Sequence, residues 1–114
     1  MDRKALIAAA IADTNGVETV EAIEAELEAG RMFLAVSPSG NTIAILQPVH
    51  DLHVVGVAGD MDELMQLEER VSRAASNEYQ RMTILPSRPR ETWLRVLEGR
   101  NWRTETSMVK DLDQ

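Results

Sequence analysis

The sequence has no cysteine, few cations and no long apolar run, and each of these shortages excludes a class of protein. Without cysteine there is no disulfide, no thiolate metal site and no cysteine nucleophile. Lys and Arg number 12 against 19 Asp and Glu, and the formal net charge of −7 makes nucleic acid a poor partner. No apolar run approaches the roughly 20 residues that a helix needs to span a bilayer, so we expect no membrane partner.

What remains is the composition of an acidic, foldable domain. Its 114 residues, 44% of them hydrophobic, suffice for one core and leave little room for a second. We therefore expect a single domain over 1–114, with an N-terminal helix and turn at 1–16 and a core at 17–112. The apolar part of MDRKALIAAAIADTNG is too short and too soon polar to predict a secretion signal. A soluble protein of the cytoplasm, or of a particle assembled there, is expected.

The first half of the sequence predicts two helices and three strands. Residues 2–12 are rich in Ala, Leu and Ile and predict a short helix that ends near Gly16. Apolar residues recur every three or four positions over 17–30, which predicts an amphipathic helix closed by Gly30. RMFLAVS and NTIAILQPV flank the turn residues SPSGN, so we expect an antiparallel hairpin of largely buried strands. LHVVGVAG, residues 52–59, predicts a third strand.

A long helix follows the third strand. It is predicted to run from Met61 to about Glu78, with Asp60 as its N-cap and Glu63 reaching back to Asp60 in a capping box. Four apolar residues are expected to line one face of this helix: Leu64, Leu67, Val71 and Ala75.

The last third of the sequence predicts a strand, a helix and a final strand. RMTILP is separated from LHVVGVAG by the long helix, so the two strands are expected to be parallel neighbours with a right-handed crossover. RETWLRVLEGRNW follows Pro89 and predicts a helix that ends at Asn101, because Asn tolerates the left-handed conformation that closes many helices. RTETSMVKDL alternates and predicts a C-terminal edge strand. The fold class is therefore α/β, with a mixed sheet flanked by helices.

This order of elements resembles that of the GNAT acyltransferase superfamily, whose members bind acyl-CoA where the central parallel strands splay apart. VLEGRNW followed by TSMVKDL is similar to the C-terminal pattern of the family: a helix, a glycine, an aromatic residue, and a strand ending in a basic residue and leucine. Asn101 stands where the family usually has glycine, and Trp102 where it has Phe or Tyr. The resemblance covers about residues 17–112 and is nearest to small GNAT-like proteins of tailed bacteriophages, some of which are virion components.

The resemblance places a cofactor loop at AGDMDEL. In catalytic members the backbone N–H groups of a Q/R-x-x-G-x-G/A loop hold the pyrophosphate. Here Gly59 is present, but no Arg or Gln precedes it and no second glycine follows at the required spacing. Instead Asp60, Asp62 and Glu63 place three carboxylates at the positive end of the helix dipole, so we expect no cofactor to bind. If acetyl-CoA does bind, the weak candidates are Val57, Gly59 and Asp60.

Catalytic residues are not recognisable in the sequence. The family's tyrosine acid lies four residues before the glycine that ends its helix, and that position is Leu97 here. The only tyrosine, Tyr79, is predicted to lie at the edge of the core. Glu18, Glu21 or Asp51 could be proposed as a general base, but each suits a solvated face better. We therefore predict no catalytic residue.

The remaining polar clusters favour ordinary structural roles. His50 and His53, with Asp51 between them, supply too few ligands at fixed positions for a metal site, and no metal is predicted. The arginines of the last third suit an exposed helix face and loop better than an acidic partner: Arg81, Arg88, Arg90, Arg95, Arg100 and Arg103. Trp93 is expected to anchor the core, and Trp102 to fix the final strand.

The sequence thus favours a non-catalytic GNAT-like protein with a structural or protein-interaction role, in a bacteriophage virion or as a phage accessory component. Its partner would be another protein or a second copy. The alternative is a divergent N-acyltransferase that uses acetyl-CoA and an amine acceptor. A third possibility is a regulatory module that presents its acidic helix to a basic partner.

Overall fold

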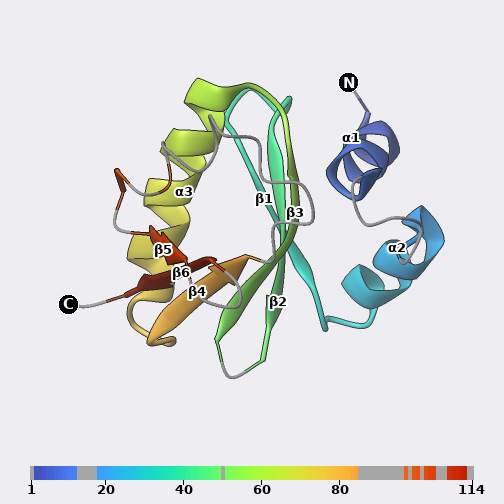
Figure 1. The fold of residues 1–114 in the computed structure, drawn as a ribbon. Coiled ribbons are helices and arrows are strands. Elements are labelled where there is room, and N and C mark those ends of the chain that lie inside the picture. Colours follow the sequence, from blue (N-terminus) through green and yellow to red (C-terminus); the bar gives the residue numbers. More distant parts are fainter. Residues whose placement is uncertain are drawn as a thin grey trace.

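The computed structural model describes residues 2–12, 18–49, 51–84, 97, 99–100, 102–104 and 108–112. Within them a six-stranded mixed sheet has the strand order β1-β2-β3-β4-β6-β5. Helices α1 and α2 lie on one face of the sheet and α3 lies on the other, so the molecule has three layers (Figure 1). The elements are α1 (Arg3–Ala10), α2 (Val20–Glu28), β1 (Phe33–Val36), β2 (Ile43–Pro48), β3 (Leu52–Ala58), α3 (Met61–Ala75), β4 (Arg81–Ile84), β5 (Trp102–Thr104) and β6 (Met108–Asp111).

Side-chain caps fix where the first two helices begin. The Asp2 carboxylate accepts a hydrogen bond from Ala5 N at 2.9 Å, and the Thr19 hydroxyl accepts one from Ala22 N at 3.1 Å. The Thr19 cap explains why α2 begins after the expected position 17. Gly30, at φ 79°, closes α2 as expected. Both predicted helices are therefore confirmed, but α1 ends at Ala10 with Ile11 as its C-cap, earlier than the expected end near Gly16. The turn at 13–17 lies outside the described residues.

The three antiparallel strands form as expected, but their burial differs. In β2 the first four residues are buried on both faces, whereas β1 leaves Phe33 43% and Val36 42% exposed. The expectation of two largely buried strands is therefore wrong for β1. The reason is topological: β1 is an edge of the sheet and has a strand neighbour on one side only.

Helix α3 and strand β4 follow the predicted course. Leu67 and Ala75 belong to the core beneath α3, Val71 packs against it, and Leu64 is buried as well. The helix ends one turn before Glu78. Strands β3 and β4 are parallel, as expected, and pair from Leu52↔Met82 to Val54↔Ile84. The α3 side of the sheet thus holds one of two hydrophobic cores, and the α1–α2 side holds the other.

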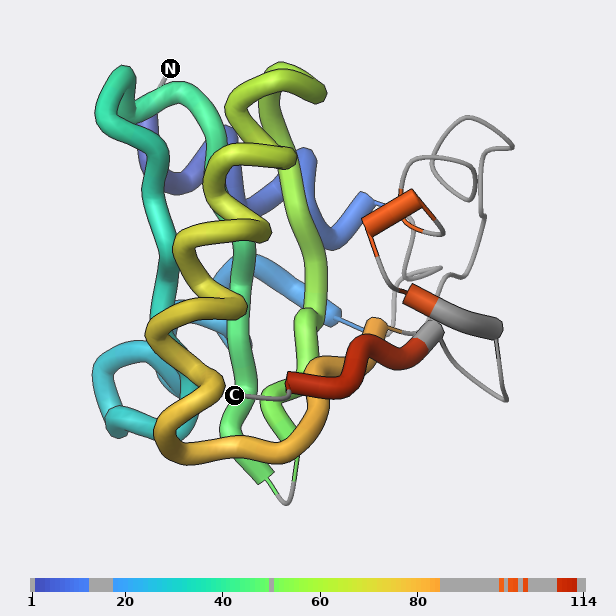
Figure 2. Tube along the Cα trace, turned by 90° about the vertical axis from the view of Figure 1, so that its left-hand side faces the viewer, coloured from blue at the N-terminus to red at the C-terminus, as the bar shows by residue number. Residues whose placement is uncertain are grey.

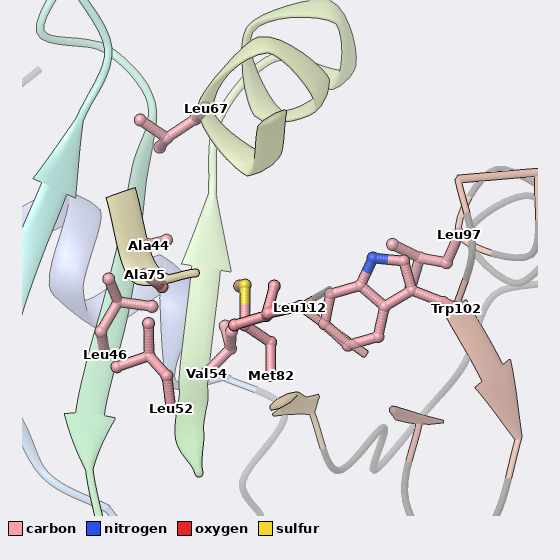
Figure 3. Close-up of a cluster of buried hydrophobic side chains, with 10 residues drawn as sticks. All are labelled: Ala44, Leu46, Leu52, Val54, Leu67, Ala75, Met82, Leu97, Trp102 and Leu112. Carbon is pink, nitrogen blue, oxygen red and sulfur yellow. The ribbon is translucent and has the colours of Figure 1, made fainter. Parts of the chain in front are cut away.

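The C-terminal strands depart from expectation. A single edge strand was expected over 103–112, but the structure has two strands, and β6 lies between β4 and β5. The edge is β5, which begins at the buried Trp102. Trp102 and Leu112 come from these C-terminal elements to join Met82 in the α3-side core (Figure 3). Of the helix predicted after Pro89, Trp93 and Asn101 lie outside the described residues. Leu97 is helical, and Gly99 and Arg100 form a turn.

Candidate functional site

The loop between β3 and α3 was the candidate cofactor site, and a close approach to Thr42, the residue before β2, shapes it. Gly59 has a φ of 133°, and a Cβ atom there would lie 2.2 Å from Thr42 Oγ1 and 2.5 Å from Thr42 Cα. No L-residue with a side chain fits this position without moving Thr42. Val57 lies just before it, half-buried on the α3 side of the sheet. Close packing against Thr42 thus accounts for the glycine.

The first turn of α3 is closed by its own side chains and by Thr42. Asp60 Oδ2 accepts a hydrogen bond from Glu63 N at 3.2 Å, which confirms the predicted cap. The predicted reciprocal bond from Glu63 to Asp60 is wrong, because the Thr42 hydroxyl stands between the two residues. It accepts from Asp60 N at 3.1 Å and donates to Glu63 Oε1 at 2.9 Å. The fully buried Thr42, which directly precedes β2, therefore completes the capping box.

The serine-containing turn between β1 and β2 extends this network. The Ser37 hydroxyl accepts a hydrogen bond from Thr42 N at 3.2 Å and lies 3.0 Å from the Ser39 hydroxyl. Hydrogen bonding by Ser39, and then by Thr42, holds the pKa of the Glu63 carboxyl below its usual value, while desolvation acts the other way. Glu63 is therefore ionised near neutral pH. An incoming phosphate would meet this charge and the Asp60 carboxylate at the end of the helix where it would have to bind.

A second candidate site is a small apolar cavity of about 50 Å³ beneath α3. Residues of α3, β2, β3 and β4 line it, together with Leu97 and Trp102. Leu97, at the position of the family's tyrosine, is buried and contributes only an apolar surface. Glu68 is the one ionisable residue among the described lining residues.

Glu68 joins α3 to the C-terminal part of the chain through three side chains, those of Arg100, Trp102 and Lys110, and it also accepts from Ser72 of its own helix. Its Oε1 accepts from Trp102 Nε1 at 3.2 Å and Ser72 Oγ at 3.1 Å and forms a close ion pair with Lys110 Nζ. Its Oε2 accepts from Arg100 Nε at 3.1 Å. Burial alone would raise the pKa of Glu68, but the hydrogen bonds and charge of Lys110, with the hydrogen bonds of Arg100 and Trp102, bring it below the usual value.

The sequence did not reveal this cluster. Glu68 lies one helical turn after Leu64, at the border of the apolar face of α3, and that border position was the only local signal. Its partners Arg100 and Lys110 lie 32 and 42 residues further along the chain. Both oxygens of the Glu68 carboxylate have cationic or hydrogen-bonding partners, as in an ion pair with a structural role.

His53 and Asp51, which were considered as metal ligands, each interact with a different residue. His53 Nδ1 lies 2.9 Å from Thr83 Oγ1 on the neighbouring strand, and burial lowers its pKa. Asp51 instead pairs with Arg81 at 3.1 Å, and His50 lies outside the described residues. In the part of the chain that the structure places, no three His, Asp or Glu side chains gather as a metal site would require.

The other candidate catalytic residues do not meet at the cavity. Glu21 is exposed on α2, across the sheet from α3, and Glu18 precedes the same helix (Figure 1). Tyr79 is half-buried at the rim of the α3-side core, as expected. Of the arginines of the last third, Arg81 and Arg100 are engaged in ion pairs. Arg88, Arg90 and Arg95 lie outside the described residues.

No family model, curated protein or solved structure matches this chain. Among the helices that the structure places, none has the length and apolar character needed to cross a membrane. The described residues form an α/β fold with a mixed sheet, and the GNAT resemblance is an interpretation of element order and of the C-terminal motif.

Proposed function

We propose that this chain is a non-catalytic, GNAT-like protein with a structural or protein-interaction role, in a bacteriophage virion or as a phage accessory protein of the host cytoplasm. The observation that carries the proposal is the start of α3. There, where the family binds pyrophosphate, Asp60 caps the helix, and Thr42 is bonded to both Asp60 N and Glu63.

Three features of this loop work against an anionic cofactor. The Glu63 N–H is already used by Asp60. The carboxylates of Asp60 and Glu63 repel phosphate at short range. Gly59 is packed closely against Thr42, the residue before β2. Cofactor binding would require these contacts to break before any new contact formed.

The experiment is isothermal titration of acetyl-CoA into the purified protein at low salt, where attraction to phosphate is least screened. We expect no saturable heat at high protein concentration. The matched control is the double variant Asp60→Asn, Glu63→Gln, which removes two charges and keeps side-chain acceptors of the same size. Binding by the variant alone would show that the carboxylates exclude the cofactor. Saturable micromolar binding to the unmodified protein, competed by excess CoA, would overturn the proposal.

Native mass spectrometry addresses the interaction role itself. Self-assembly or association with particles supports a structural role. A discrete complex with a basic host protein would instead support the regulatory module, with the acidic helix α2 as its binding surface.

The alternative, an N-acyltransferase with acetyl-CoA and an amine acceptor, is favoured by the cavity. It is apolar, and it lies beside the parallel pair β3–β4, the position at which the resemblance places the acyl chain. Val54↔Ile84 is the last paired position, whereas β3 continues to Ala58. Acetyl transfer to an amine, lost on filling the cavity with Ala44→Leu in a protein that stays folded, would establish this alternative.

A further inference from the structure

Within the described residues, strand β1 forms one edge of the sheet and pairs with a strand on one side only. Ser37 N donates to Thr42 O at 2.9 Å, so Ser37 faces β2 with its backbone groups. Because these groups alternate in direction along an antiparallel strand, those of Leu34 and Val36 point outward. Figure 2 shows β1 in teal at the left edge of the sheet, with α3 in yellow in front of it.

A contact from α3 independently confirms this direction. Arg70 Nη2 donates to Val36 O at 2.8 Å, which requires that carbonyl to point away from β2. Among the described residues no carboxylate lies within ion-pairing distance of Arg70. Its neighbour Arg73, by contrast, pairs with Glu69 at 2.9 Å. The edge therefore carries a guanidinium whose charge is not balanced by a nearby carboxylate of the described chain.

The side chains of β1 do not protect the edge. The strand FLAV contains no charged residue and no proline, the usual devices against strand addition. Phe33 lies on the α3 side of the sheet and Val36 on the other, and each is more than two-fifths exposed. A strand laid against β1 would find apolar contacts on both faces and, near Arg70, a cation on the α3 face.

We propose that β1 takes up an extended peptide strand of a partner protein in which acidic residues alternate with β-branched apolar ones. The peptide backbone would pair with the outward groups of Leu34 and Val36, and a carboxylate on the α3 face would pair with Arg70. The Val36 carbonyl has two lone pairs, so it can accept from Arg70 and from the peptide together. This inference rests on the proposed interaction role, since it names the surface and the chemistry of the partner.

A second copy of the chain fits this edge poorly. Two β1 strands paired antiparallel about a two-fold axis would bring two Arg70 guanidiniums to the same seam, without a carboxylate between them. Local charge thus favours an acidic strand over self-pairing.

The test is an NMR titration of the ¹⁵N-labelled protein, at physiological ionic strength, with the capped peptide Thr-Val-Glu-Val-Glu-Val-Thr and its Lys-for-Glu counterpart. We expect saturable shifts at Leu34 and Val36 with the Glu peptide only, and slower exchange of both amides. Arg70→Gln should weaken binding about 2- to 5-fold, as the loss of one exposed ion pair implies. The control Arg73→Gln should leave binding unchanged.

Val36→Pro tests the backbone pairing. Because the Val36 N–H points outward, proline there removes no bond to β2, and it should weaken binding about 5-fold or more. If this variant fails to fold, slower exchange of the two amides in the unmodified protein still decides the matter.

Three results would overturn the proposal: no shift at β1 with the Glu peptide, equal binding of the Lys peptide, or a concentration-dependent dimer that Val36→Pro abolishes. None of these measurements involves acetyl-CoA. The proposal that β1 binds a peptide can therefore be refuted while the non-catalytic role is upheld, and the non-catalytic role can be refuted while peptide binding is upheld.

Discussion

Replacing Glu68 by glutamine should destabilise the protein by more than any exposed charge change on α3. The side chain of Glu68 is 9% exposed, and its ion-pair partners Lys110 and Arg100 are 15% and 33% exposed. Glutamine has the same shape and can still accept from Trp102, but it leaves the Lys110 ammonium without a counter-charge in a largely buried site.

The expected size follows from the burial of the partners. Breaking a fully buried ion pair by removing one charge costs about 3–5 kcal/mol. Because Arg100 is a third exposed and can turn to water, we expect Glu68→Gln to lower the free energy of unfolding by about 2–3 kcal/mol. The double variant Glu68→Gln, Lys110→Met removes both charges and should recover part of that loss.

The assay is urea denaturation followed by circular dichroism, over a range of pH. The pKa of Glu68 is lowered in the folded state, so its stabilisation is complete above the ordinary carboxyl value of 4.5 and is lost as the pH falls through the lower folded value. The difference between the wild type and Glu68→Gln should therefore shrink in acid. A change below about 0.5 kcal/mol at pH 7 would refute the reasoning, because surface substitutions have effects of that size.

Three further outcomes are expected. Gly59→Ala should lower the free energy of unfolding, measured by urea denaturation, by at least about 2 kcal/mol, because the new Cβ would strike Thr42. Gly40→Ala, at φ 77° with nothing within 4 Å, should lower it by only about 1–2 kcal/mol, and equal losses would contradict the packing role of Gly59. Asp60→Ala should cost about 0.5–2 kcal/mol through loss of the cap and Asp60→Asn much less, a contrast that thermal unfolding can check. By NMR titration His53 should have a pKa below 6.5, so the stability that its neutral form contributes is lost as the pH falls below that value. A pKa above 6.5 would show that burial is not the main influence on the pKa of His53.

Local signals in the sequence predicted most of the fold. The Asp60 cap and the glycine that ends α2 act over one helical turn, and the turn SPSGN joins strands that are adjacent in the chain. The parallel pairing of β3 and β4 followed from the length of the helix between them. Each of these features depends on residues close together in sequence.

The sequence could not predict features that depend on distant residues. The exposure of β1 depends on its place at the sheet edge, and β1 itself contains nothing that distinguishes an edge from a centre. The insertion of β6 between β4 and β5 depends on competition among strands. At the candidate site, Thr42 completes the cap of α3 from a position 21 residues before Glu63, so a capping-box pattern could not include it.

The position of β6 also constrains the order in which the sheet can assemble. In the described chain, β5 pairs with β6 alone, and β6 pairs with β4. Strand β5 is earlier in the chain than β6, yet it has no sheet to join until β6 has bridged to β4, from Ile84↔Met108 to Arg81↔Asp111. That bridge closes a long loop before it yields contacts, which slows folding. We therefore expect the β1–β3 antiparallel sheet to form first and the C-terminal strands last, with Trp102 fluorescence reporting the final step.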